Sequence, residues 1–351
     1  MKRFYLCLLS LFCLSVFSQR IQTIHIQTEK SKGFNLSSIA EQIHPIGLEM
    51  NQEHHFDCIS DVLWSKEYLF VSVYSLNVLT KQRLPIRILQ YDFSGKLIRE
   101  IGEQSTNIRK LMCDTIKSRL FIPKGREVSS YDFDGILQEK YFLKDVPYLY
   151  DKNYFWIHHT DPHQGEMHYH LIGYDLLSKK EVNIHTYSDS TLKVGSALLG
   201  RTAGFSFYDH MPCVAFGLDN MLHRIEGDKI VPFVRFNIEP AIATLEKVQY
   251  QFQGFIGNYL CINYITNNQF YLYMKCMSTG QEFQTQYRYS KEGILTNGIK
   301  DDILATGFCD IEPLNRTGYF YFIKNREELI DNPNIHNKNV LYTIFLVRLK
   351  H

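Results

Sequence analysis

The feature of the sequence with the clearest potential for chemistry is a cluster of histidines between positions 158 and 170, which holds five of the 14 histidines. Asp161 and Glu166 lie among them. Imidazole and carboxylate are ligands for zinc, copper and nickel. The members of the cluster are His158, His159, His163, His168 and His170.

The expected geometry of this stretch is a β-hairpin with a loop over 161–166. If Thr160 pairs with Met167, His159 faces His168, and His170 lies on the same side of the sheet. His163 would then stand at the tip. The candidate metal ligands are therefore His159, His163, His168 and His170. The spacing matches no established metal motif, and the alternative is a solvated loop whose histidines hydrogen-bond locally.

Other reactive residue types have simpler interpretations. Ser206, Asp209 and His210 contain the three types of a catalytic triad, but the G-x-S-x-G pattern of a nucleophile elbow is missing around them. We therefore predict no catalytic residue here. Aromatic residues suggest a carbohydrate site, since sugar faces stack on rings, although packing between strands is the alternative. These aromatics are Tyr148, Tyr150, Tyr154 and Trp156.

The elements that must position such residues repeat along the chain. The phrase YDFSGKL at 91–97 returns as YDFDGIL at 131–137, and Tyr174-Asp175-Leu176 echoes it again. Each phrase predicts a strand, a tight turn and a strand. The recurring Asp92, Asp132 and Asp175 are expected to hydrogen-bond turn amides rather than to bind calcium. A period of about 40 residues built from short strands is typical of a β-propeller blade.

Six such units fit the length, so we expect an all-β, six-bladed β-propeller with four-stranded antiparallel blades. The last unit is one strand short, and we expect residues 21–28 to complete it as an N-terminal closing strand. The capping-box spacing of Ser38 and Glu41 predicts a short helix within a lead-in over 30–50. A second short helix is expected from 239 to about 249. Residues 19–351 would form one domain.

The N-terminus has the pattern of a signal peptide over residues 1–18. Lys2 and Arg3 precede an apolar run, Leu6 to Val16, that is too short to cross a bilayer as a helix. This predicts a periplasmic, cell-surface or secreted protein without a transmembrane segment after cleavage. The net charge of +1 and the lack of a Lys/Arg block argue against a nucleic-acid partner.

Six cysteines follow the signal segment, which permits disulfides in an exported protein. If Asn268-Gln269 forms a two-residue turn, Cys261 lies opposite Cys276, and a bridge between them is possible. The alternative is that these thiols are reduced and packed in the interior.

The chain resembles the six-bladed β-propeller family of exported Bacteroidetes proteins, which is related to NHL and TolB-like propellers. The residues that carry the resemblance are 36–39, 46–49, 59–62 and 91–102, and it is clear over about residues 20–145. The chain differs from the family pattern at residues 103–107, where it has EQSTN and such proteins often have a Gly/Pro-rich turn. The resemblance implies a fold and no particular reaction.

These observations leave two hypotheses about function. The first is a non-catalytic binding or scaffold propeller for a protein or glycan, without a cofactor. The alternative is a metal-dependent propeller hydrolase or lactonase with its site in the central channel, which needs polar residues from the inner strands of several blades. The strands expected to be innermost are 68–74, 154–159, 259–266 and 319–323. These are mainly apolar or aromatic, which favours the first function and makes an enzyme less expected.

Overall fold

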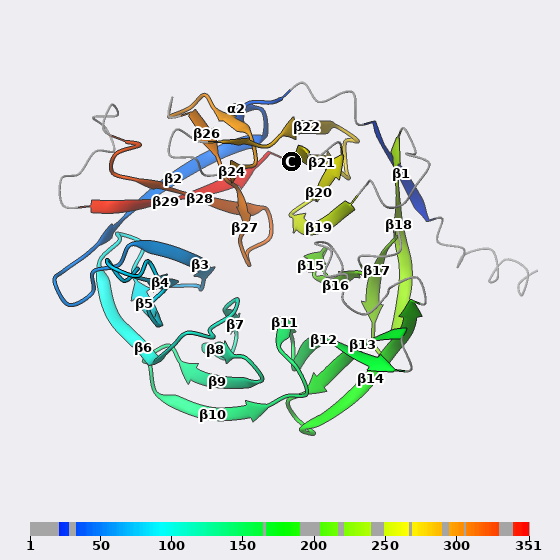
Figure 1. The fold of residues 1–351 in the computed structure, drawn as a ribbon, viewed down its shortest axis with the longest axis horizontal. Helices are drawn as coiled ribbons and strands as arrows, with labels where there is room; N and C mark the ends of the chain where they lie inside the picture. The colour runs from blue at the N-terminus through cyan, green and yellow to red at the C-terminus, as the bar shows by residue number, and fades with distance from the viewer. Residues whose placement is uncertain are drawn as a thin grey trace, which may run out of the picture.

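The computed structural model is a ring of β-sheets around a central axis (Figure 1). It describes residues 21–27, 33–163, 166–189, 204–216, 221–239, 249–266, 269–289, 295–304, 307–329 and 340–350. The predicted signal segment and Asn268 of the predicted turn lie outside these residues. Of the helix predicted from 239 to about 249, residues 240–248 also lie outside them, whereas Glu239 ends one strand and Gln249 begins the next. Within them, no helix is long and apolar enough to span a membrane.

The first three blades follow one another along the chain, and each is an antiparallel sheet of four strands. Blade one has β3 (Cys58–Trp64), β4 (Leu69–Tyr74), β5 (Ile86–Tyr91) and β6 (Leu97–Ser105). Blade two has β7 (Met112–Asp114), β8 (Arg119–Lys124), β9 (Glu127–Asp132) and β10 (Leu137–Phe142). Blade three has β11 (Pro147–Asp151), β12 (Tyr154–His163), β13 (Glu166–Asp175) and β14 (Lys180–Asp189).

The second half of the ring has three further blades. Blade four has β15 (Gly204–Tyr208), β16 (Met211–Ala215), β17 (Met221–Glu226), β18 (Lys229–Glu239) and, as a fifth strand, β1 (Gln22–Gln27). Blade five has β19 (Gln249–Ile256), β20 (Tyr259–Thr266), β21 (Gln269–Cys276) and β22 (Glu282–Gln286). Blade six has β27 (Glu312–Pro313), β28 (Tyr319–Asn325), β29 (Val340–Leu349) and β2 (Ala40–Glu49).

Two small two-stranded sheets lie between blades five and six along the chain. They pair β23 (Arg288–Tyr289) with β24 (Leu295–Thr296) and β25 (Ile299–Asp301) with β26 (Gly307–Cys309). The single helix of the described residues is α2 (Leu36–Ile39), one turn long. The short helix predicted within the lead-in over 30–50 is confirmed. Its predicted start at Ser38 was wrong, because the helix ends at Ile39 and the chain from Ala40 onward is extended and pairs with β29.

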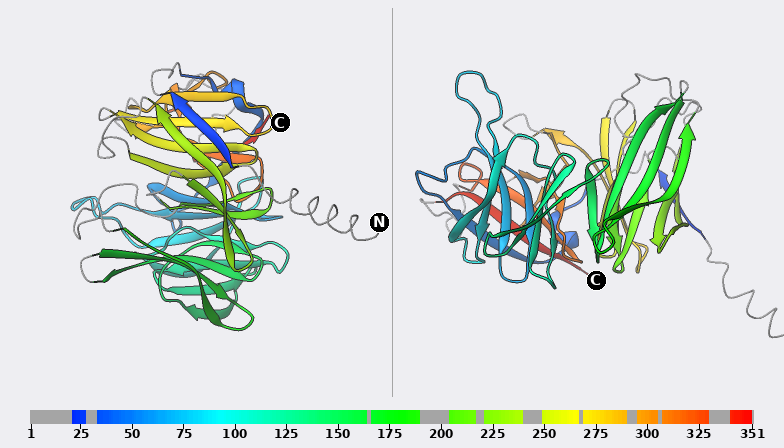
Figure 2. Two further views of the ribbon diagram at one scale, coloured as in Figure 1. Left: turned by 90° about the vertical axis from the view of Figure 1, so that its right-hand side faces the viewer. Right: turned by 90° about the horizontal axis from the view of Figure 1, so that it is seen from below.

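The ring is closed by an N-terminal strand, as predicted, but by a different one. Strand β2 pairs antiparallel with β29 and places Ile46 opposite Ile344. Residues 22–27 instead form β1, which runs parallel to β18 on the outer rim of blade four, with Ile24 opposite Phe236 (Figures 1 and 2). Both segments alternate apolar and polar residues, so either could fill a sheet edge. The position of each free edge in space decides between them.

The interior consists of separate hydrophobic clusters, several of which join neighbouring blades. One cluster joins blade two to blade three through Phe121 and Phe155, whose rings meet edge to face at 5.1 Å. In blade four, Ile24 and Ile26 of β1 are fully buried in a cluster that also includes Tyr264 of blade five. The N-terminal strand therefore holds two blades together.

The repeated turn works as expected. The Asp92 carboxylate accepts hydrogen bonds from the amides of Ser94 (2.8 Å) and Lys96 (3.0 Å). Asp132 does the same for Asp134 and Ile136, at 3.0 and 2.9 Å. The structural interpretation of these aspartates is confirmed.

The Cys261–Cys276 pairing was wrong. The hairpin closes with Thr266 opposite Gln269, so Cys261 faces Met274 and Cys276 faces Tyr259. All six cysteines after the signal segment are free thiols, and four of them are buried. The packing of buried reduced thiols as small hydrophobic residues is the outcome that the structure supports.

Candidate functional site

The strands closest to the axis are the first strands of the blades: β3, β7, β11, β15, β19 and β27 (Figure 1). The strands that we expected to be innermost are instead the second ones, β4, β12, β20 and β28. The apolar character of those strands reflects burial between their neighbours. The true inner strands carry charged residues, among them Asp61, Asp114, Asp151 and Glu312. The expectation of an apolar channel was therefore wrong.

Two cavities lie along the axis. The first has a volume of about 600 Å³ and is lined at the end of the ring where the inner strands turn into the second strands. The second has a volume of about 690 Å³ and is lined at the opposite end, where the chain enters β3, β7 and β27. Lys110 and Pro313 line both. We call the first the aromatic cavity and the second the acidic cavity.

The aromatic cavity has a stacked ring pair on its wall. Tyr148 of β11 and Phe205 of β15 lie with ring centroids 5.5 Å apart and an angle of 18° between the planes. Tyr148 is 37% exposed, so part of its ring is available to a ligand. The pair belongs to two neighbouring blades and lies within the cavity.

Positive side chains line the cavity that contains this ring pair. The aromatic cavity is lined by four cationic side chains, Lys110, Lys117, Lys152 and Arg316, against two carboxylates, Asp114 and Asp151. One of those carboxylates is structural, since Asp114 accepts hydrogen bonds from the Tyr150 hydroxyl at 2.7 Å and from the Ile116 and Lys117 amides. Burial raises the pKa of the other, Asp151.

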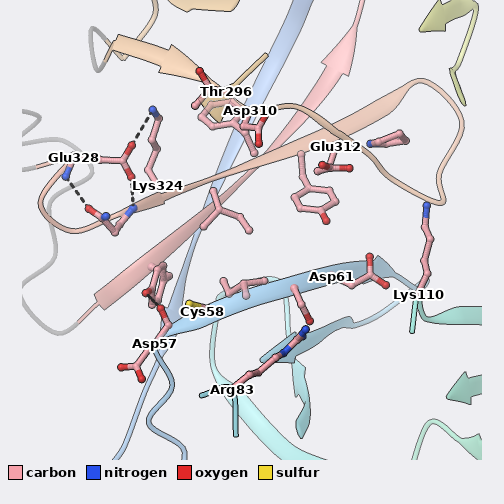
Figure 3. A pocket seen from close by; sticks show the side chains of 18 of the residues that line it. Asp57, Cys58, Asp61, Arg83, Lys110, Thr296, Asp310, Glu312, Lys324 and Glu328 are labelled. Carbon is pink, nitrogen blue, oxygen red and sulfur yellow. Dashed lines mark hydrogen bonds and ion pairs between the residues drawn. The ribbon is translucent and has the colours of Figure 1, made fainter. Parts of the chain in front are cut away.

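The acidic cavity collects carboxylates from the two blades at the closure of the ring. Figure 3 shows Asp61 and Glu312 on facing strands, with Lys110 at the edge of the cavity and Asp310 beyond Glu312. Lys324, also in the wall, is paired with Glu328 at 3.2 Å and with the Phe308 carbonyl at 2.7 Å. Its charge is therefore already compensated.

The protein surroundings shift the titration of these carboxyl groups. Glu312 is an exposed residue, but desolvation of its carboxyl group within the cavity raises the pKa to about 7; the neighbouring Asp310 adds to this rise, and Lys110 opposes it. Burial also raises the pKa values of Asp61 and Asp310. Asp61 accepts a hydrogen bond from the Leu111 amide at 2.7 Å, which ties β3 to the next blade. Within the described residues, no hydrogen bond holds the Glu312 carboxylate.

The predicted histidine hairpin forms, with its register shifted by two residues. Met167 pairs with Pro162 rather than with Thr160, so His159 lies opposite His170 and not opposite His168. A shift of two keeps every side chain on its predicted face, because side chains alternate with a period of two. The loop is therefore tighter than the predicted one over 161–166, with His163 opposite Glu166 in the backbone pairing.

The histidines of this hairpin pair with nearby acids. The ring centroids of His159 and His170 are 6.0 Å apart. His159 pairs with Asp145 at 2.8 Å, and His170 pairs with Asp161 at 3.5 Å. Each of the two imidazoles therefore has its own carboxylate partner.

The metal prediction for this hairpin stays a prediction. The side chain of His163 is outside the described residues. Among the residues that are described, no group of three His, Cys, Asp or Glu side chains has the geometry to hold a metal ion. His158, the fifth member of the cluster, is buried against the Tyr169 ring, and burial lowers its pKa to about 4.

The triad residue types do not assemble. Ser206 accepts a hydrogen bond from the Phe255 amide at 2.8 Å and so links β15 to β19. Asp209 and His210 form the β15–β16 turn with positive φ values of 48° and 61°. The serine therefore serves the contact between two blades.

The structure separates the four aromatic residues that suggested a carbohydrate site. Tyr148 is exposed in the cavity, whereas Tyr150 is buried and bonded to Asp114, and Tyr154 stacks on Trp156. The sequence analysis did not identify three other residues of the cavity: Phe205, whose ring stacks on Tyr148, and the cations Lys152 and Arg316. Arg316 follows a short strand and Lys152 lies in a tight turn, so the signal that could have found them was the order of strands within each blade.

Comparison with known proteins agrees with this fold. No family model matches the chain, and no curated protein matches it. A Bacteroides fragilis protein named as exported has a TM-score of 0.63 at 13% identity, covering 94% of this chain and 100% of that one. The β-propeller domain of the Trilobed protease of Pyrococcus furiosus gives a TM-score of 0.41 at 9% identity, covering 84% and 95%. At these identities the likeness concerns the fold alone, and the chain is a six-bladed β-propeller.

Proposed function

We propose that the protein is an exported binding propeller that holds a carbohydrate ligand in the aromatic cavity. The observation that carries the proposal is the stacked pair of Tyr148 and Phe205 inside a cavity of about 600 Å³. Ligand sites in proteins are concave, have volumes of about 300–1,000 Å³, and combine ring faces with a few polar groups. Export is supported by the N-terminal pattern and by the likeness to an exported protein.

A glycan fits this geometry better than a protein surface does. A protein partner of standard size needs a contact area of about 800 Å² on each side. A cavity of about 600 Å³ can instead take a single chain or a sugar end. Tyr148 and Phe205 supply the apolar face on which a sugar ring stacks, and Asn153 and His210 line the same cavity with hydrogen-bonding groups.

The test is a glycan screen with the mature chain, followed by calorimetry on the glycans that bind. Replacing both rings, Tyr148→Ala with Phe205→Ala, should weaken binding by about tenfold or more, since ring contacts contribute about 0.5–1.5 kcal/mol each. The matched control is Tyr289→Ala, because Tyr289 is 72% exposed and lies outside the cavity. A screen without any bound glycan, or equal loss in the control, would contradict the proposal.

A hydrolase that works in the channel is the second candidate. The specific observation in its favour is Glu312, whose raised pKa of about 7 suits a general acid or base. Incubating each bound glycan with the wild type and with Glu312→Gln, and measuring the products by mass spectrometry, tests this candidate. Product formation by the wild type alone would support an enzyme, and intact glycan in both would exclude glycan hydrolysis.

A further inference from the structure

We propose that the ligand of the aromatic cavity is anionic, a glycan that carries carboxylate or sulfate groups, with Arg316 and Lys152 as its counter-charges. This inference rests on the proposed function and specifies the class of glycan. Three features of the cavity lead to it: the two cations, their positions on opposite walls, and the hydrogen bonds of the nearby carboxylate.

Arg316 is held in place by aromatic rings rather than by an acid. Its guanidinium lies 4.3 Å from the centroid of the Trp64 ring and 4.7 Å from that of Tyr319. The neighbouring Asn315 fixes Trp64 through two hydrogen bonds of 2.7 Å to its backbone amide and carbonyl. In the described part of the chain, no carboxylate forms an ion pair with Arg316. Aromatic rings attract the cation but supply no acceptor for its N–H groups, which can therefore bind an anion.

Lys152 is placed by a constrained turn. It has a positive φ of 55° in the β11–β12 hairpin, a conformation that a residue other than glycine adopts at some cost. The Lys152 carbonyl shares the hydrogen of the Tyr150 hydroxyl with Asp114, and the next residue, Asn153, accepts a hydrogen bond from Lys117 at 2.7 Å. Among the described residues, no acid lies within ion-pair distance of the Lys152 ammonium.

The two cations approach the cavity from opposite sides of the channel. Lys152 belongs to blade three and Arg316 lies beside β27 of blade six, and these blades stand across the ring from each other (Figure 1). Tyr148 lies four residues before Lys152 in the same cavity wall. A sugar stacked on Tyr148 and Phe205 would therefore have positive charge on both flanks. Of the two acids that line the cavity, Asp114 is already engaged by the Tyr150 hydroxyl and two amides. The other, Asp151, interacts electrostatically with the adjacent Lys152, and burial raises its pKa, which favours its neutral form.

The experiment compares matched pairs of probes on the mature chain. Oligosaccharides of uronic acids are paired with their carboxyl-reduced forms, and sulfated oligosaccharides with their desulfated forms. We expect at least one acidic member to bind about tenfold or more tighter than its neutral partner, because a hydrogen-bonded charge pair contributes about 1.5–3 kcal/mol. Preference within the panel then separates carboxylate from sulfate recognition.

Two variants assign the effect to the proposed residues. Arg316→Gln with Lys152→Gln should remove the preference for the acidic member, so that the acidic and the neutral member of each pair bind the double variant alike. Lys229→Gln, at an exposed site of blade four, is the charge-matched control and should change neither. Raising the salt concentration should weaken acidic binding to the unmodified protein, a readout that needs no variant.

The outcomes separate the two proposals. Equal binding of acidic and neutral members, or a preference that survives in the double variant, would overturn the anionic assignment and leave the glycan proposal standing. Absence of binding by every glycan probe would overturn the glycan proposal itself. Acidic preference that disappears in the double variant and with salt supports both.

Discussion

The aromatic and acidic cavities share an axis and a lysine, yet one acid in each, Asp114 and Glu312, differs in its hydrogen bonds. In the aromatic cavity Asp114 is 7% exposed and accepts three hydrogen bonds from its own blade and the next. In the acidic cavity Glu312 has no such partner among the described residues, and its pKa is about 7. A carboxylate inside a propeller channel can thus stabilise the fold by accepting hydrogen bonds, or it can be available for proton exchange. The number of hydrogen-bond donors around the carboxylate distinguishes the two roles.

The largest effect is expected from removing the structural acid. Asp114→Ala leaves the Ile116 and Lys117 amides without their acceptor and the Tyr150 hydroxyl with the Lys152 carbonyl alone, so we expect a loss of about 3 kcal/mol in the free energy of unfolding. Urea unfolding at pH 7 measures it. Asp114→Asn keeps an acceptor oxygen and should recover part of the loss. An unchanged free energy of unfolding in Asp114→Ala would contradict the structural role of Asp114 and with it the difference between Asp114 and Glu312.

A buried histidine outside both cavities, His223, makes the folded protein less stable at acid pH. It therefore sets the lower end of the pH range in which variants of the two cavities can be compared. Burial lowers the pKa of His223 to about 4, and repulsion from His185 adds to the shift. Because the unfolded chain takes up this proton near pH 6.5 and the folded chain only near 4, stability is complete above pH 6.5 and is lost as the pH falls toward 4.

The expected loss for His223 is on the order of 3 kcal/mol at pH 4. His223→Phe should make the free energy of unfolding fall less steeply between pH 6.5 and 4, whatever its effect at neutral pH. Urea titrations at several pH values give the slope. Parallel slopes in the variant and the wild type would show that another group causes the acid loss.

A smaller effect of opposite sign is expected at Glu312. Its folded pKa is raised above the unfolded value, so its ionisation costs stability as the pH rises from about 4.5 to above 7. Glu312→Gln should be more stable than the wild type at pH 8 and equal to it at pH 4.5. The carboxylate reaches the solvent of the cavity, and screening keeps the gain below about 1 kcal/mol.

Thermal unfolding at pH 4.5 and 8 measures this difference, with Glu67→Gln in the exposed β3–β4 turn as the control. A gain in the control of the same size would assign the effect to net charge. A lower stability of Glu312→Gln than of the wild type at pH 8 would mean that the Glu312 carboxylate stabilises the fold, as that of Asp114 does.

The smallest expected change concerns Lys110, the lysine common to both cavities. Its charge lowers the pKa of both Asp61 and Glu312. Lys110→Met should therefore raise both values, with little change in stability for an exposed side chain. Carbon-13 NMR titration of the carboxyl groups reports this directly. An unchanged pKa of Glu312 in Lys110→Met would indicate that the Lys110 side chain points away from the acidic cavity in solution.

Much of the architecture was predictable because it is encoded locally. The turn signals at Asp92-Gly95 and Asp132-Gly135 set the blade period, since an aspartate and a glycine are what such a turn requires. The histidine hairpin was predicted with the correct faces, although the length of its loop was overestimated by the two-residue shift at Met167. The closing strand, the inner strands and the cavity cations were not predicted, because they depend on which edges meet after the ring has formed.

Sequence alone thus determined that this chain forms six repeated all-β units, because strand alternation and turn chemistry act between residues close along the chain. Only the tertiary structure decided that β2 rather than β1 completes the ring, and that Arg316 and Lys152 stand on opposite walls of one cavity. Those relations join residues that are far apart along the chain, and no local pattern carries the free energy that selects them.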